Sequence, residues 1–184
     1  MSALKFRVLL DTEKDTEIFR DILISEDADF ETFYTAIINA FRFEGNQMAS
    51  FYVSNENWDK GHEISLMDMS YGDEASEEIV SNMADSRLAD FIEEADQKFI
   101  LVYDFMRMWI FLIELIERTG EEVSEPVVAM SVGMAPPEDS KMMDLNDEEE
   151  EGFDLDEEDD DIFGSEFEDG YDDDDYSGYN EYDY

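Results

Sequence analysis

Apolar side chains recur at every second position in several segments of the chain, which is the pattern of strands that bury one face. The first two such segments are Leu4–Leu10 and Phe19–Ile24, separated by a charged turn. Met48–Ser54 alternates in the same way. After a polar turn, Glu63–Leu66 predicts a short return strand, so the first part of the chain is expected to be rich in strands.

Two later segments are apolar at almost every position. Phe99–Phe105 and Trp109–Leu115 both alternate, but the residues between their apolar positions are mostly apolar as well. Strands with two apolar faces belong in the middle of a covered sheet. After a break at Gly120–Pro126, Val127–Val132 predicts one last apolar strand.

One segment has the periodicity of a helix. Between Phe30 and Phe41 the apolar residues are spaced by three and four positions, as on one face of an amphipathic helix. Asp27–Asp29 offers an N-cap, Gly45 marks the loop that follows, and a second, short helix is predicted near Ser86–Ile92. The predicted fold class is therefore α+β, with a mixed, mostly antiparallel sheet packed against one long helix and short helices.

Composition changes abruptly beyond Lys141. The chain holds 53 acidic and 11 basic residues, a formal net charge of −42. From Asp144 to Tyr184 there are 22 acidic residues and no basic one. Such runs repel themselves and offer no contiguous apolar surface to offset the entropy of ordering. We expect an α+β domain at 1–140 and a disordered acidic tail at 141–184.

The charge also bears on partners. The residues before the tail are acidic too, so direct binding to nucleic-acid phosphates is not expected, whereas a basic protein partner fits. Aromatic residues interrupt the acidic runs of the tail, and such segments can dock on a basic groove; the alternative is a tail that only solvates. The candidate partner-binding positions are Asp159, Asp160, Asp161, Ile162, Phe163, Phe167, Tyr171, Asp172, Asp173, Asp174, Asp175 and Tyr176.

Features that would place the chain outside the cytoplasm are missing from the sequence. There is no cysteine, which fits a reducing compartment. The apolar run near the N-terminus is too short and too charged for a signal peptide. The longest apolar stretch, Met108–Ile116, is interrupted by Glu114 and cannot span a bilayer. We expect a cytoplasmic protein without a membrane partner.

Few residues suggest chemistry. His62 is the only histidine and follows Gly61 in a predicted turn, where a solvated side chain is expected. No phosphate-binding glycine loop is present, and the tail does not match the calcium loop of an EF-hand. Asp104, at the end of a buried strand, is expected to cap the following turn or to pair with Arg107, and Glu114 is its only candidate catalytic partner. No catalytic residue, metal ligand or cofactor is assigned.

The segment Leu4–Asp139 resembles the plasmid pRiA4b ORF-3-like family. The resemblance rests on the order of elements, on the loop around Gly45, and on two motifs, Tyr-Asp-Phe followed by Trp and Gly-x-x-Pro-Pro-Glu-Asp. The matching positions, whose role is not known, are Tyr103, Asp104, Phe105, Trp109, Gly133, Pro136, Pro137, Glu138 and Asp139.

This chain departs from the family at polar positions. The family's Gly-Asp after Tyr-Asp-Phe is replaced by Met106 and Arg107, and its His after the Trp is replaced by Phe111. Histidines common in an earlier loop fall at Gln47 and Ala49. The family is associated with mobile elements, but this sequence shows neither a recombinase nucleophile nor a basic DNA-binding arm.

Three functional hypotheses follow. The leading one is a non-enzymatic interaction protein whose acidic tail binds or shields a basic partner, for example a nucleic-acid-binding protein. The second is a divalent-metal-dependent enzyme that uses Asp104, Glu114 and the carboxylates of Pro-Pro-Glu-Asp. The third is an oligomerising scaffold, suggested by the apolar residues on both faces of the sheet. The sequence predicts neither the partner nor the oligomeric state.

Overall fold

A computed structural model describes residues 2–67 and 80–142 of the chain. The strands are β1 (Ala3–Leu10), β2 (Phe19–Ser25), β3 (Ala49–Ser54), β4 (Glu63–Ser65), β5 (Ser81–Asn82), β6 (Lys98–Tyr103), β7 (Trp109–Thr119) and β8 (Val127–Val132). The helices are α1 (Phe30–Phe41) and three 3-10 helices, η1 (Met83–Asp85), η2 (Leu88–Phe91) and η3 (Glu138–Ser140).

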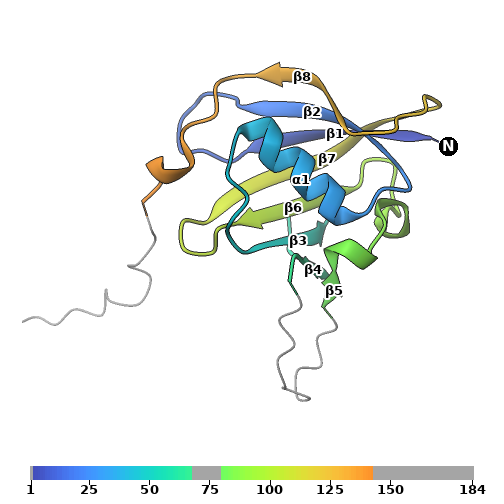
Figure 1. The fold of residues 1–184 in the computed structure, drawn as a ribbon, viewed down its shortest axis with the longest axis horizontal. Coiled ribbons are helices and arrows are strands. Elements are labelled where there is room, and N and C mark those ends of the chain that lie inside the picture. Colours follow the sequence, from blue (N-terminus) through green and yellow to red (C-terminus); the bar gives the residue numbers. More distant parts are fainter. Residues whose placement is uncertain (1, 68–79, 143–184) are drawn as a thin grey trace, which may run out of the picture. The chain divides into compact units, whose positions relative to one another are not determined.

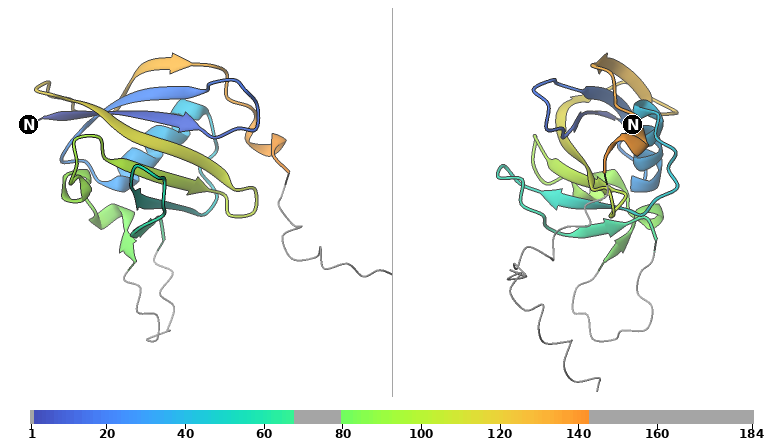
Figure 2. Two further views of the ribbon diagram at one scale, coloured as in Figure 1. Left: turned by 180° about the vertical axis from the view of Figure 1, so that it is seen from behind. Right: turned by 90° about the vertical axis from the view of Figure 1, so that its left-hand side faces the viewer.

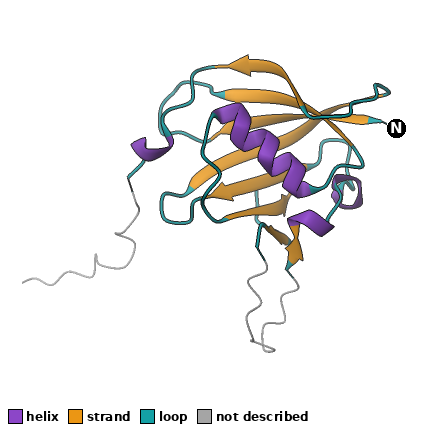
Figure 3. Ribbon diagram, viewed as in Figure 1, coloured by secondary structure: helices purple, strands orange, loops and turns teal. Residues whose placement is uncertain are grey.

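The strands of residues 2–67 and 80–142 form one eight-stranded sheet with the order β5-β4-β3-β6-β7-β1-β2-β8. Every neighbouring pair is antiparallel except β4 and β5, which are parallel. Figure 1 shows α1 lying across one face of this sheet, and Figure 3 shows that the remaining helices are short turns. The fold class that the sequence predicts, a mostly antiparallel sheet with one long helix, is confirmed.

Helix α1 starts and ends where its sequence directs. The side chain of Asp29, at the N-cap, accepts a hydrogen bond of 2.7 Å from the backbone nitrogen of Thr32, which satisfies one free N–H of the first turn. At the other end Arg42 adopts a left-handed conformation with φ of 59°, and its backbone N–H bonds the carbonyl of Asn39. The predicted N-cap segment and apolar stripe are both confirmed.

The core between α1 and the sheet is built largely from phenylalanines. Phe33 of α1 lies between Phe6 of β1 and Phe51 of β3, with ring centroids 4.8 and 5.7 Å away. Phe30 packs edge-to-face on Phe51 at 5.1 Å. All four side chains are fully buried, so this aromatic layer joins the helix to strands on both sides of β6 and β7.

Strands β6 and β7 take the central position that their sequences predict, but α1 covers only one face of the sheet. From behind, Figure 2 shows the opposite face with no helix of the described residues upon it. On that open face Ile100 and Val102 of β6 are still buried, because cross-strand neighbours cover them. Leu112 and Glu114 of β7 remain partly exposed. The turn between β3 and β4 also reaches this face, because Trp58 lines a small hollow there with Leu112 and Glu114.

The last strand, β8, is an edge strand. It pairs with β2, with Val128 opposite Ile22, and the register shifts by one residue beside that pair. Although its sequence is apolar, Val127, Val128 and Met130 are 52%, 44% and 50% exposed. Native proteins usually protect an exposed, uncharged edge of this kind with charges, prolines or a covering segment.

Candidate functional site

Residues of the two family motifs meet where β6 ends and β7 begins. One oxygen of the Glu138 carboxylate accepts a hydrogen bond of 2.5 Å from the hydroxyl of Tyr103. The other oxygen accepts one of 2.7 Å from the backbone nitrogen of Glu44. The indole Nε1 of Trp109 donates to the carbonyl of Glu138 at 3.1 Å. We call residues 136–141 the clasp, because these contacts fasten them to the sheet.

Further contacts complete the clasp. The backbone nitrogen of Gly45 donates to the Tyr103 hydroxyl at 3.0 Å, so this hydroxyl both donates and accepts. The ammonium of Lys141 donates to the carbonyl of Met108 and lies 5.4 Å from the centre of the Trp109 ring. The Nε of Arg107 donates to the carbonyl of Lys141 at 3.1 Å. The motif residues therefore hold the segment after β8 against the sheet.

Asp104 belongs to the turn rather than to an open site. Its backbone is left-handed, with φ of 59°, which ends β6 at Tyr103 and leaves Phe105 in the turn instead of the strand that the alternation predicts. One carboxylate oxygen accepts hydrogen bonds from the backbone nitrogens of Met106 and Arg107, at 3.1 and 3.2 Å. The guanidinium of Arg107 lies 3.9 Å from the other oxygen. Both contacts that the sequence predicts for Asp104 are present.

The carboxylates of the metal-dependent hypothesis do not converge. Glu138 is bound inside the clasp, Asp104 inside its turn, and Glu114 lies 3.8 Å from the ammonium of Lys98. Within residues 2–67 and 80–142, no three His, Cys, Asp or Glu side chains are grouped as metal ligands would be. The geometric basis of that hypothesis is therefore missing from the described part of the chain.

Two of the positions where this chain departs from its relatives, Phe111 and Ala49, are filled by apolar packing, whereas Gln47 and Met106 are exposed. Phe111 is fully buried, and its ring lies 4.9 Å from Phe41 and 5.9 Å from Phe43. Phe43 also contacts Trp109 at 5.0 Å. Ala49 is buried as well. An aromatic cluster thus occupies the place where the resemblance implies polar side chains.

His62 contacts a serine but lacks the rest of a catalytic set. Its Nε2 lies 2.7 Å from the Oγ of Ser81, and its ring stacks on Phe91 at 5.8 Å. For the described residues, no hydrogen bond reaches the other ring nitrogen, so the carboxylate that orients a catalytic histidine is not provided. The pair joins β4 to β5 at the surface.

Tyr34 is a buried hydroxyl beside the clasp. It is 5% exposed, its ring lies 6.3 Å from Tyr103, and its oxygen has no hydrogen-bond partner among the described residues. Burial raises the pKa of Tyr34 to about 12, and the charge of Glu138 adds to this effect. Burial also raises the pKa of Tyr103, and the hydrogen bond to Glu138 raises this pKa further.

Replacing Tyr34 by phenylalanine is expected to raise the free energy of unfolding by about 1 kcal/mol, because it removes a buried, unpaired hydroxyl. It should also change the response to alkali. An unfolded tyrosine ionises near pH 10, so the native chain loses stability as pH rises from about 10 through the folded pKa of about 12. In urea titrations, Tyr34→Phe should lose less free energy of unfolding between pH 8 and 10.5 than the native chain does. Tyr103→Phe is the matched control and should destabilise, since it removes the hydrogen-bond partner of the Gly45 nitrogen and of one Glu138 carboxylate oxygen.

Gly133, another motif position, has a backbone conformation and a close neighbour that favour glycine. Its φ is 75°, and a Cβ there would lie 2.6 Å from the carbonyl oxygen of Glu17. Gly133→Ala is expected to cost at least about 1–2 kcal/mol from the left-handed backbone alone. Gly120→Ala is the control, because a Cβ at Gly120 meets nothing within 4 Å. Equal midpoints for the two variants in thermal unfolding would contradict this explanation.

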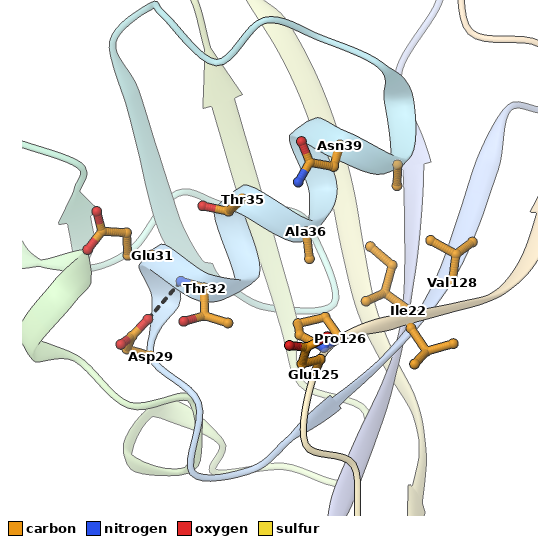
Figure 4. A pocket seen from close by; sticks show the side chains of 12 residues that line it. Ile22, Asp29, Glu31, Thr32, Thr35, Ala36, Asn39, Glu125, Pro126 and Val128 are labelled. Atoms are coloured by element: carbon orange, nitrogen blue, oxygen red, sulfur yellow. Dashed lines mark hydrogen bonds between the residues drawn. The ribbon is translucent and has the colours of Figure 1, made fainter.

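A groove of about 760 Å³ lies between α1 and the edge of the sheet (Figure 4). On the helix side it is lined by the short side chains of Thr32, Ala36 and Ala40, which follow one another at four-residue spacing. On the sheet side it is lined by Ile22 of β2 and Val128 of β8. The groove exists because these short helical side chains do not fill the space above the last two strands.

The groove is charged at one end. Asp29 and Glu31 at the start of α1, and Glu125 just before β8, contribute carboxylates to its lining, and none of the lining residues is basic. Beyond the opposite end, Arg20 is buried. Its Nε donates a hydrogen bond to the carbonyl of Ala40, and its Nη1 donates one to the carbonyl of Val132. The groove is thus a trough of mixed lining, with Thr35 and Asn39 among its polar residues and carboxylates at one end.

Sequence reasoning did not find this groove. The small residues at Thr32, Ala36 and Ala40 were the available signal, but they became informative only once β8 was placed beside β2. The twelve candidate partner-binding positions, Asp159–Phe163, Phe167 and Tyr171–Tyr176, lie outside the described residues. No helix in the described ranges has the length and apolar character needed to cross a bilayer.

The structure defines an α+β protein with a long helix on one face of a largely antiparallel sheet. Its motif residues hold the clasp in place. The sequence profile of plasmid pRiA4b ORF-3-like proteins matches residues 2–174, and the chain belongs to this family. The match extends past Asp139, where the motif resemblance ended, into the acidic segment.

Among solved structures, the chain is similar to a protein of unknown function from Methanosarcina mazei Go1. The TM-score is 0.64 at 19% identity, over 77% of this chain and 75% of the other. This likeness shows the fold alone. No curated protein matches the sequence.

Proposed function

We propose that this chain is a non-enzymatic interaction protein that binds a basic polypeptide partner. The observation that carries the proposal is that most of the few basic side chains are paired with groups of the same chain. Seven of the 11 basic residues hold carboxylates or backbone carbonyls of the same chain. They are Lys5, Arg7, Arg20, Arg87, Lys98, Arg107 and Lys141.

This use of the cations leaves acidic groups in large excess. Arg7, for example, makes two hydrogen bonds of 2.9 Å to Asp21, so its charge is neutralised within the sheet. An acidic surface repels phosphates and attracts basic segments, raising the rate of encounter with a cationic partner. The acidic segment from Asp144 to Tyr184, with its interspersed aromatics, extends this character.

The state of the motif residues favours binding over catalysis. Tyr103, Asp104 and Glu138, which would be the first candidates for a reaction centre, are bound to groups of their own chain. A general acid or base needs a free approach to substrate. Their arrangement supports a role in holding the clasp.

The test is an affinity capture from cytosolic extract at moderate salt with three chains. These are the full chain, a chain ending at Met142, which keeps the clasp, and a full chain whose aromatic and aliphatic residues after Asp144 are replaced by serine. Basic proteins should be retained by the full chain and released by added salt. Reduced retention by the serine variant would show that the aromatics dock. Failure of all three chains to retain any basic protein would refute the proposed function.

A further inference from the structure

We propose that the groove between α1 and β8 is a docking site for an extended, basic segment of another protein, which adds as a strand to the free edge of β8. This inference rests on the proposed function and names the surface that serves it. In this mode of recognition the backbone of the edge strand supplies hydrogen bonds, and alternate side chains of the added strand enter a neighbouring groove.

The two edges of the sheet differ in a way that marks β8. At one edge β5 contains only Ser81 and Asn82, too short to template another strand. At the other edge β8 has six residues, Val127–Val132, and none is charged. Soluble proteins usually protect such an edge with lysines, prolines or a covering loop. For the described residues, β2 is the only strand that pairs with β8.

The exposed side chains of β8 add to this signal. Val127, Val128 and Met130 are each about half exposed on the strand that carries the free edge. Val128 also lines the groove, beside Ile22 and opposite Ala36 of α1. A strand added to β8 would place every second side chain on the helix side of the sheet, next to this trough (Figure 4).

The carboxylates at one end of the groove favour a basic segment as its occupant. Asp29, Glu31 and Glu125 lie at the end of the groove where β8 begins, so a lysine or arginine of the added strand would meet carboxylates there. A second copy of this chain would instead bring its own acidic residues to the same place, and each copy carries a formal net charge of −42. Repulsion between copies therefore favours a basic partner over self-association.

The test uses the full chain and a fluorescein-labelled peptide of eight residues in which lysine and valine alternate. Fluorescence anisotropy gives its dissociation constant. Two further peptides carry N-methyl groups on the odd or the even backbone nitrogens, which keeps the charge but removes strand hydrogen bonds. One of these two should bind about tenfold more weakly than the unmodified peptide, whereas simple attraction to acidic residues would treat all three alike.

Variants of the full chain locate the site. Glu31→Gln with Glu125→Gln should weaken binding about three- to tenfold. Glu13→Gln with Asp15→Asn makes the same change in net charge in the turn between β1 and β2, near the other end of β8, and should change binding less than twofold. Ala36→Phe fills the groove without changing charge and should weaken binding at least as much as the double glutamine variant. Thermal unfolding checks that each variant is folded.

Three results would overturn the inference. The first is equal affinity for all three peptides. The second is equal loss in the groove and control variants. The third is a dimer, seen by sedimentation velocity, that Ala36→Phe dissociates, because the edge would then be occupied by a second copy. If any of these is found while the full chain still retains basic proteins from extract, the docking surface is wrong and the proposed function stands.

Discussion

Phe33→Ala is expected to lower the free energy of unfolding by about 3–5 kcal/mol, the usual cost of truncating a fully buried phenylalanine. Phe33 is 0% exposed and lies between Phe6 and Phe51, so the truncation leaves a cavity bounded by strands on both sides of the sheet centre and by α1. The surrounding rings are held by their own strands and cannot close this space. Urea unfolding, followed by circular dichroism, measures the loss.

Phe105→Ala is the matched control for Phe33. Phe105 is 37% exposed in the turn after β6, so its truncation should cost less than about 1 kcal/mol. If the two variants unfold at the same urea concentration, the aromatic layer under α1 does not hold the fold together. If Phe105→Ala proved the more damaging, the turn rather than the core would be the critical element.

The second large effect is expected at the clasp. Glu138→Ala removes the acceptor of two hydrogen bonds, from the Tyr103 hydroxyl and from the backbone nitrogen of Glu44. Because hydrogen bonds to a charged group contribute about 1.5–3 kcal/mol, and the Tyr103 side chain is buried, we expect a loss of about 2–4 kcal/mol. Limited proteolysis should show earlier cleavage near Pro136–Lys141.

The neighbouring residue gives the control for the clasp. Asp139 is exposed, so Asp139→Ala should change stability by less than about 0.5 kcal/mol. A double variant, Glu138→Ala with Tyr103→Phe, should cost less than the sum of the single changes, since both remove the same hydrogen bond. Full additivity would mean that the two side chains do not act on each other.

The fold was predictable because its signals are local. The alternation in Leu4–Leu10, the spacing between Phe30 and Phe41, and the cap at Asp29 each follow from residues close in sequence. The parts that sequence did not predict depend on chain segments far apart. The partner of Glu138 comes from 35 residues earlier at Tyr103, and the groove requires α1 and β8 together.

Burial was the harder quantity to predict. The apolar sequence of Val127–Val132 is that of a strand, but only the sheet order shows that it lies at an edge with its side chains exposed. Phe105 continued the alternation of β6, yet the left-handed backbone of Asp104 ended the strand before it. A pattern of apolar residues predicts whether a segment is a helix or a strand. It does not predict which elements lie beside that segment, because this depends on the topology.

The position of β1 between β7 and β2 has a consequence for how the chain acquires its fold. Lys5 of β1 bonds Glu117 of β7, 112 residues later, and this pairing joins β1 and β2 to the rest of the sheet. A high contact order of this kind slows folding, because a long loop must close before the contacts form. On the ribosome, β1, β2 and α1 must therefore wait for β7 to emerge, exposing the phenylalanines that later become the core. Delaying translation before Trp109 should lengthen this exposed interval, whereas a delay after β7 has left the ribosomal exit tunnel should leave it unchanged.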